Sequence, residues 1–186
     1  MKVNIGVSNH HIHLTKEDYY ELFGTYEINN IKDLVQTGEF ASDSKVSIKT
    51  EKNTINNLRV LGPFRDYTQV EISKTDSYTL GIDPPVRDSG DIKGSAVVTI
   101  EGPKGSITKE CCIIATRHIH MSYTERVKLG LQNVEIVSVR VGAEKSSILN
   151  NVHIKQTPNG VFEMHLDTDD ANANFLKTGD VGEIII

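Results

Sequence analysis

Two short stretches, about a hundred residues apart, carry the side chains best suited to chemistry. One is His10–Thr15, which reads HHIHLT, and the other is Arg117–Ser122, which reads RHIHMS. Together they contain five of the seven histidines in the chain. A neutral imidazole offers a nitrogen lone pair near pH 7, which makes histidine the commonest metal ligand in proteins. The two stretches therefore indicate a metal-dependent site to which each contributes a His-x-His pair.

The spacing of the histidines selects the element that must carry them. Residues i and i+2 of a β-strand point to the same face, so His11 and His13 would project together while the apolar residues beside them turn into the core. The same geometry applies to His118 and His120. His10 falls on the opposite face, where its counterpart is an arginine, so we interpret it as a residue that does not bind the metal.

The repeat continues beyond the histidines. Three further pairs of segments match in the same order: Val70–Ile72 with Met164–Leu166, Thr75-Asp76 with Thr168-Asp169, and Ser89–Asp91 with Thr178–Asp180. We infer a duplication into two related halves, residues 1–105 and 106–186, with room for exchange of a strand or a terminus between them. In this alignment Glu71 takes the place of His165, which suggests that both are ligands.

The candidate metal ligands are thus three residues in each half, although the first half could instead lend ligands to the second. They are His11, His13, Glu71, His118, His120 and His165. Imidazole and carboxylate donors suit zinc or cobalt, and three protein ligands leave one coordination position open for catalysis. His153 has no counterpart in the repeat and is expected to be a surface residue.

The elements that would position these ligands are mainly β-strands. Short Val- and Ile-rich segments alternate with turn signals, which favours a closed barrel or a sandwich. They include residues 45–49, 69–73, 95–100 and 134–139. Hydroxyl or acidic residues predict short helices that begin near Thr15, Ser122 and Asp169.

The bulk composition excludes several classes of function. The chain has 186 residues and a net charge of −5, which argues against a nucleic-acid-binding protein. It has neither the long apolar run of a membrane span nor an N-terminal signal peptide, so we expect a cytoplasmic protein with no membrane partner. Cys111 and Cys112 are adjacent in an apolar run and are predicted to be packing residues.

Two arginines lie in loops shaped by proline and glycine. Arg65 ends the segment Gly62-Pro63-Phe64-Arg65, and Arg87 follows Pro84-Pro85-Val86. A guanidinium is a planar fork that matches the oxygens of a phosphate group. Phosphate binding is therefore a candidate role for both, and for Arg87 a solvated surface role is equally consistent with the pattern.

Five motifs resemble those of the propanediol-utilisation type of phosphate acyltransferase, also called phosphate propanoyltransferase or phosphotransacylase. The resemblance runs from about residue 4 to the C-terminus. The motifs are Gly6–Leu14, Gly62–Ser73, Pro84–Asp91, Ala115–Met121 and Met164–Asp169. Their number and order make the resemblance specific, and His10, where the family commonly has arginine, is its one departure within these motifs.

The resemblance implies a mainly β protein of two related β-barrel domains with a few short capping helices. A two-zinc site between the domains would serve reversible transfer of a propanoyl or acetyl group between coenzyme A and inorganic phosphate. The six ligands above would hold the metals, Arg65 would handle phosphate, and Ser89 would lie near the reacting groups. Some relatives carry an N-terminal extension that directs them into bacterial microcompartments, and because the sequence starts almost at the first strand we expect it to lack that extension. Homo-oligomer formation and microcompartment association stay open.

Two other functions are compatible with the histidines. A dinuclear metallo-hydrolase would need a general base, for which the chain offers no obvious carboxylate beyond Glu71. A non-enzymatic metal-binding module would need the histidines but not Arg65. The sequence does not select between acetyl and propanoyl groups, and it identifies no coenzyme A contacts, although Lys2, Lys74 and Arg126 could serve.

Overall fold

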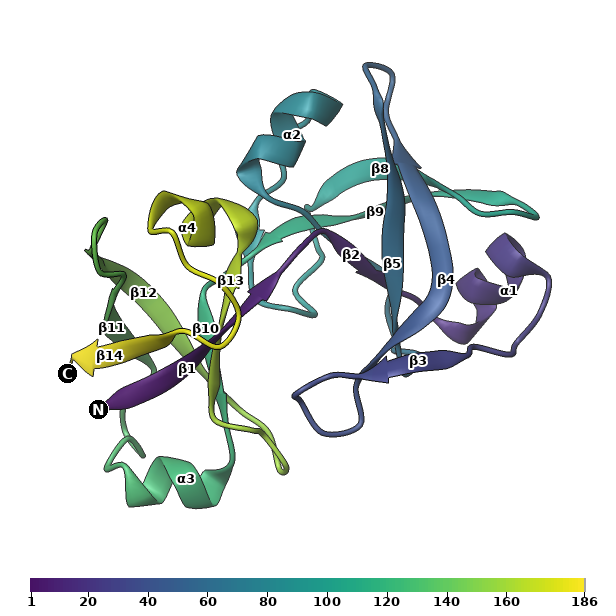
Figure 1. Cartoon of the computed structure of the whole chain (residues 1–186). Coiled ribbons are helices and arrows are strands. Elements are labelled where there is room, and N and C mark those ends of the chain that lie inside the picture. The colour runs from purple at the N-terminus through teal and green to yellow at the C-terminus, as the bar shows by residue number, and fades with distance from the viewer. Residues whose placement is uncertain (186) are drawn as a thin grey trace. The chain divides into compact units, whose positions relative to one another are not determined.

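The structure is a computed structural model and describes residues 1–185 of the chain. Its contacts divide the chain into two compact units (Figure 1). The central unit comprises His10–Ala115, and the terminal unit comprises Met1–Asn9 with the chain from Thr116 onward. Within the described residues, no helix is long and apolar enough to cross a membrane.

Six strands of the central unit close into a ring. Their order is β4-β5-β2-β6-β9-β8, and β8 pairs back with β4. The bounds of these strands are β2 His11–His13, β4 Phe40–Lys49, β5 Thr54–Gly62, β6 Gln69–Glu71, β8 Ala96–Glu101 and β9 Ser106–Ala115. Two further strands, β3 (Asn30–Asp33) and β7 (Val86–Arg87), pair with β4 and β9, and the unit also carries helices α1 (Lys16–Phe23) and α2 (Lys74–Leu80).

The terminal unit is a second closed barrel of six strands in the order β1-β13-β10-β12-β11-β14. The bounds of these strands are β1 Lys2–Ser8, β10 His118–Met121, β11 Ile136–Val141, β12 Ser147–Gln156, β13 Glu163–Asp167 and β14 Val181–Ile185. Helices α3 (Tyr123–Lys128) and α4 (Thr168–Ala173) complete it. The prediction of a mainly β chain with two related barrels and a few short helices is therefore confirmed.

The two barrels share one pattern of strand pairing. The strand with the His-x-His pair, β2 or β10, runs parallel to β5 or β12 and antiparallel to β6 or β13. The next strand round the ring is β9 in the central unit and β1 in the terminal unit, each parallel to its neighbour. Strands β1 and β9 directly precede the two His-x-His strands, so each is the first strand of its own repeat. Each nevertheless belongs to the barrel that is built from the other repeat. The division of the sequence at residue 105 stays a prediction about the repeats.

Each barrel is filled by its own apolar core. Ile12 and Leu14, which alternate with the histidines of β2, are buried in the central core, and Ile119 and Met121 are buried in the terminal core. This alternation is what turns the histidines to the opposite face of each strand.

The two cysteines also belong to the central core, as predicted. Cys111 and Cys112 are buried on β9. Burial raises the pKa of the Cys111 thiol to about 12 and also raises the pKa of the Cys112 thiol. Both thiols are therefore protonated near neutral pH, which suits packing rather than nucleophilic chemistry.

The helices begin at polar caps. Thr15 and Ser122 cap α1 and α3, where the sequence predicted helix starts, and Asp167 caps α4 two residues before the predicted start. Helix α2 was not predicted, although Ser73 and Asp76 form a capping box in which each side chain accepts from the other's backbone N–H. The caps Ser73 and Asp167 each lie two residues beyond the third candidate ligand of their unit, so Asp76 corresponds to Asp170 and the predicted match of Asp76 with Asp169 is wrong by one position.

The same helices are tied to the residue that precedes each His-x-His pair. His10 Nδ1 lies 3.2 Å from Asp76 Oδ2 in the central unit. In the terminal unit Arg117 donates from Nε and Nη2 to the two carboxylate oxygens of Asp170, at 2.6 and 2.7 Å. His10 is thus the counterpart of Arg117 in an anchor between the histidine strand and the helix, which explains why it points away from its neighbouring histidines.

We predict that Asp76→Ala lowers the free energy of unfolding by about 1 kcal/mol at pH 7, because it removes half of the capping box and the partner of His10. Burial by itself would raise the pKa of Asp76, but hydrogen bonds from His10 and the Ser73 backbone outweigh it and hold the pKa below its ordinary value of 3.8. The stabilisation is therefore present above that value and is lost as the pH falls through the lowered pKa.

Urea unfolding at pH 7 and at pH about 3 would measure this difference. The exposed Asp83, which pairs with Lys74 at the surface, supplies the control Asp83→Ala, which should change stability little. An equal loss for Asp76→Ala at both pH values would contradict the assignment.

Candidate functional site

The central unit brings together His11, His13 and Glu71. Strands β2 and β6 pair in a register that sets His11 opposite Glu71. His11 Nε2 lies 3.4 Å from Glu71 Oε2, and His13 Nε2 lies 4.0 Å from Glu71 Oε1. The two imidazole rings meet edge to face with centroids 5.2 Å apart. The three side chains predicted from the sequence therefore form one cluster.

The terminal unit brings together His118, His120 and His165 by the same construction. Strands β10 and β13 set His118 opposite His165, as β2 and β6 set His11 opposite Glu71. His118 Nε2 and His120 Nε2 are 3.1 Å apart, and the ring of His165 lies 4.7 Å from that of His120 between centroids. Within each cluster one ligand atom per residue lies within 4.8 Å of the others.

The distances and tautomers fit a small cation. Donors that surround a tetrahedral zinc ion at about 2.0–2.1 Å lie about 3.4 Å from one another. The His118 Nδ1–H donates to the Thr116 carbonyl oxygen at 2.8 Å, so in the neutral ring the lone pair is on Nε2, facing His120. A cation is the natural partner for ring nitrogens that face one another at this separation. Both clusters can therefore hold a metal ion.

The clusters are partly withdrawn from solvent. His13 is 4 % exposed, and His11 and His120 are each 8 % exposed. Glu71, His118 and His165 are partly buried, so each cluster keeps some exposure to solvent. Carboxylate and imidazole groups this far from bulk water interact more strongly with a cation than they would at the surface.

A chain of hydrogen bonds links the predicted Arg65 and Ser89 to the central cluster. Arg65 Nη1 donates to the Tyr67 hydroxyl at 3.3 Å, and that hydroxyl lies 3.4 Å from Ser89 Oγ. Gln69 Nε2 donates both to Ser89 Oγ at 2.9 Å and to Glu71 Oε1 at 2.7 Å. A guanidinium, two hydroxyls and a cluster that can hold metal are thus joined within one unit.

Sequence reasoning missed three members of this network, namely Glu39, Tyr67 and Gln69. Arg65 Nη2 donates to Glu39 Oε1 at 2.5 Å, which holds the guanidinium in place. Gln69 could have been found, because it lies two residues before Glu71 on β6 and so shares its face. Tyr67 lies in a bend before β6, where strand alternation gives no such signal. Glu39 precedes β4 in a loop and gave no such signal.

Other residues considered from the sequence have different surroundings. Arg126 is buried and donates to the carbonyl oxygens of Leu131 and Val134 and to the Glu135 carboxylate, so its guanidinium supports the α3 segment rather than a coenzyme A contact. Arg87 lies 3.5 Å from Asp91 through Nε and is partly exposed. His153, predicted to be a surface residue, is partly exposed, is the register partner of His118 and lies outside both ligand clusters.

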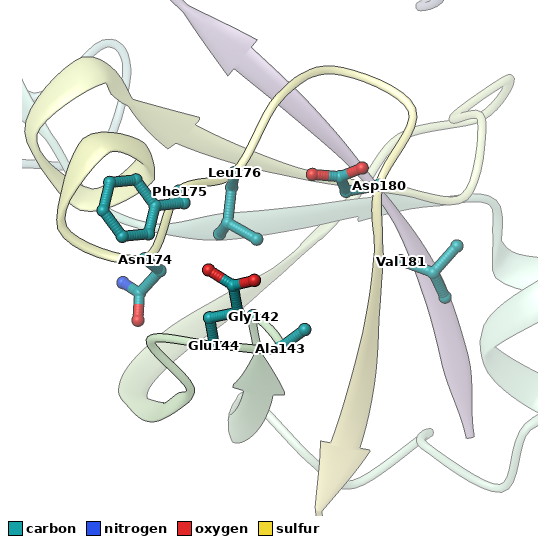
Figure 2. A pocket seen from close by; sticks show the side chains of 8 residues that line it. All are labelled: Gly142, Ala143, Glu144, Asn174, Phe175, Leu176, Asp180 and Val181. Atoms are coloured by element: carbon teal, nitrogen blue, oxygen red, sulfur yellow. The ribbon is translucent and has the colours of Figure 1, made fainter.

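A hollow of about 550 Å³ lies elsewhere in the terminal unit (Figure 2). It is framed by the loop between β11 and β12 and by the segment that follows α4, with Glu144, Phe175 and Asp180 among its lining residues. Phe175 has a backbone φ of 53° and a 69 % exposed side chain, with Lys145 Nζ 4.9 Å from its ring centroid. None of the six candidate ligands lines this hollow.

Comparison with known proteins places these observations in a family. The sequence model of the phosphate propanoyltransferase family matches residues 4–177. The chain is similar to the phosphate propanoyltransferase of Thermotoga maritima, with 46% identity over 97% of this chain and 88% of that protein. It is also similar to the enzymes of that name from Lachnoclostridium phytofermentans, at 45% identity over 98% and 87%, and from Salmonella typhimurium, at 42% over 92% and 82%.

We predict that His11→Ala and His118→Ala each remove about one bound divalent ion per chain, because each deletes one of three ligands from a different cluster. Elemental analysis after equilibration with Zn²⁺ and gel filtration would give the count. His10→Ala is the matched control, since it deletes a neighbouring histidine that faces Asp76 instead. Unchanged metal content in both ligand variants would rule out the assignment.

Proposed function

Because the chain belongs to the phosphate propanoyltransferase family, it is an acyltransferase that uses phosphate, and we propose that it transfers a propanoyl or acetyl group reversibly between coenzyme A and inorganic phosphate. The observation that carries this proposal is the hydrogen-bonded chain from Arg65 through Tyr67, Ser89 and Gln69 to Glu71. It supplies anion binding beside a cluster that can hold a metal ion.

In the proposed reaction a phosphate oxygen attacks the carbonyl carbon of the thioester. The new carbon–oxygen bond forms, the carbon–sulfur bond breaks, and the proton carried by hydrogen phosphate ends on the departing thiolate. The products are acyl phosphate and free coenzyme A. The barrier reflects the need to orient a hydrated phosphate and to stabilise the negative charge that develops on the carbonyl oxygen.

Arg65 is the proposed phosphate-binding residue. Its guanidinium offers parallel N–H groups that match two phosphate oxygens, and the ion pair with Glu39 holds its plane in one orientation. A fixed fork orients the attacking oxygen at less entropic cost than a mobile side chain would. We therefore assign Glu39 to positioning Arg65 in addition to balancing its charge.

Ser89 is the proposed hydroxyl close to the reacting groups. Its Oγ accepts a hydrogen bond from Gln69 Nε2, so its own hydrogen is directed away from that amide. The Ser89 hydroxyl is then available to donate to a phosphate oxygen or to the developing oxyanion. Gln69 also bonds Glu71, so the position of the hydroxyl is coupled to the position of the carboxylate.

Six residues would hold two ions, for which we propose zinc, with cobalt as an alternative that the same donors accept. They are His11, His13 and Glu71 in the central unit, and His118, His120 and His165 in the terminal unit. Such ions would supply Lewis acidity and a template for anionic oxygens. The protein would fix each donor through paired strands and limit the access of water to the site.

Membership of an acyltransferase family leaves the alternatives of a metallo-hydrolase and a plain metal-binding module without support. Formation of a homo-oligomer, association with a microcompartment, and coenzyme A contacts from Lys2 and Lys74 stay predictions.

We predict that Arg65→Lys raises the apparent KM for phosphate and lowers turnover, with metal content unchanged, because lysine keeps the charge but lacks the fork. Loss of about 2–3 kcal/mol of charge-assisted contact corresponds to a ~30- to 150-fold fall in kcat/KM. The KM for the acyl-CoA substrate should move much less. Steady-state kinetics with both substrates varied would measure each constant.

The control is Arg140→Lys, which alters an exposed arginine that pairs with Glu183 on the terminal barrel. It should leave both Michaelis constants unchanged. If Arg65→Lys showed wild-type phosphate kinetics, the proposed anion site would be wrong.

A further inference from the structure

Each barrel carries a polar residue two positions before its third candidate ligand, and these two residues differ. On β6 this residue is Gln69, ahead of Glu71, and on β13 it is Glu163, ahead of His165. The strand registers are equivalent, because Gln69 lies opposite His13 and Glu163 lies opposite His120. The two repeats therefore place an amide and a carboxylate at the same structural position.

In the central unit the amide suits its neighbour. The Gly90 backbone N–H donates to Gln69 Oε1 at 2.8 Å, which identifies the oxygen of the amide. The amide nitrogen is thereby turned toward Glu71 and donates to its Oε1 at 2.7 Å. A carboxylate ligand needs a donor beside it to fix its orientation, and Gln69 is that donor.

In the terminal unit the carboxylate suits its neighbour equally well. Glu163 Oε2 lies 2.8 Å from His165 Nε2, and the Glu163 side chain is only 9 % exposed. An ionised carboxylate only accepts hydrogen bonds, so the hydrogen of His165 lies on Nε2. In the neutral ring the lone pair is then on Nδ1.

The neighbouring strand leaves room for this carboxylate. Gly6 on β1 is the register partner of His165. A Cβ atom at Gly6 would lie 3.0 Å from Glu163 Oε2 and 3.2 Å from His165 Cδ2, closer than most such contacts in proteins. Because Gly6 has no side chain, the side chains of Glu163 and His165 can lie side by side next to β1.

We propose that Glu163 is a positioning residue for the metal cluster of the terminal unit, and that it accepts from His165 Nε2–H so that His165 binds the ion through Nδ1. In the terminal unit the supporting residue, Glu163, then accepts a hydrogen bond from the ligand His165. In the central unit the supporting residue, Gln69, instead donates one to the ligand Glu71. Each cluster with its supporting residue contains one carboxylate, so both ions would meet the same formal charge. This inference rests on the metal binding of the proposed function.

The alternative is that Glu163 forms a structural ion pair with no bearing on the metal. The two ideas differ in what happens when His165 is replaced by glutamate, the residue type that the central unit has at the equivalent position. Beside a glutamate, Glu163 would repel the new ligand, whereas a glutamine would donate to it as Gln69 donates to Glu71. If Glu163 acts through hydrogen-bond polarity, Glu163→Gln should therefore weaken zinc binding when residue 165 is histidine and strengthen it when residue 165 is glutamate.

The experiment measures zinc affinity by competition with a chromophoric chelator in the full chain. All variants carry His11→Ala, which confines zinc binding to the terminal cluster. Glu163→Gln should weaken zinc binding about 10- to 100-fold when His165 is present. Added to His165→Glu, the same change should strengthen zinc binding relative to His165→Glu alone. Circular dichroism and thermal unfolding would show that each variant is folded, and Glu163→Asp, which keeps the charge with a shorter reach, should bind with intermediate affinity.

Two results would count against the proposal in different ways. Weakened or unchanged binding from Glu163→Gln in both backgrounds would show that Glu163 does not act through the polarity of residue 165, while leaving the proposed function intact. If the His11→Ala parent bound no zinc, and His118→Ala removed none from the otherwise unmodified chain, the terminal metal site and this inference would both be wrong.

Discussion

The two-residue period of an extended strand is the constraint on which the rest of this structure depends. It turns His11 and His13 to one face while Ile12 is buried in the core, and it does the same for the histidines on either side of Ile119. Antiparallel pairing in a fixed register then delivers a third donor from the neighbouring strand. A shift of one residue on either strand would send a ligand into the core. The register that buries the apolar residues is therefore the same register that brings the ligands together.

Duplication gave the two barrels the same framework, and the residues in which they differ indicate how their roles are divided. Both have the clusters, the helix caps and the anchor from the histidine strand to the helix, although the anchor is His10 with Asp76 in one and Arg117 with Asp170 in the other. The hydrogen-bonded chain from Arg65 to Glu71 belongs to the central unit. We infer that the central unit handles phosphate, while the terminal unit supplies a second ion of matched charge.

Much of this was predictable because the determining patterns are local. The His-x-His spacing, the alternation with apolar residues and the ordered repeat were enough to predict six clustered side chains in two related β-rich halves. The expectation that each half is a barrel rather than a sandwich came from the family resemblance. The capping box at Ser73 and Asp76 was an equally local signal for α2, and Glu163 could have been found by extending the repeat two residues before His165. What local patterns do not contain is long-range pairing. The exchange of β1 and β9 between barrels and the contact of Glu39 with Arg65 join segments that are distant in sequence, and only the closed sheets determine them.

The central claim is that these two barrels hold paired donors for metal ions that serve acyl transfer to phosphate. The most direct test is to strip the protein with a chelator and add Zn²⁺ or Co²⁺ stepwise, while following bound metal and the formation of acyl phosphate from propanoyl-CoA and phosphate in the same samples. The account predicts negligible transfer in the stripped protein and full recovery as bound metal approaches about two ions per chain. Full acyl transfer by stripped protein that remains free of metal would contradict it.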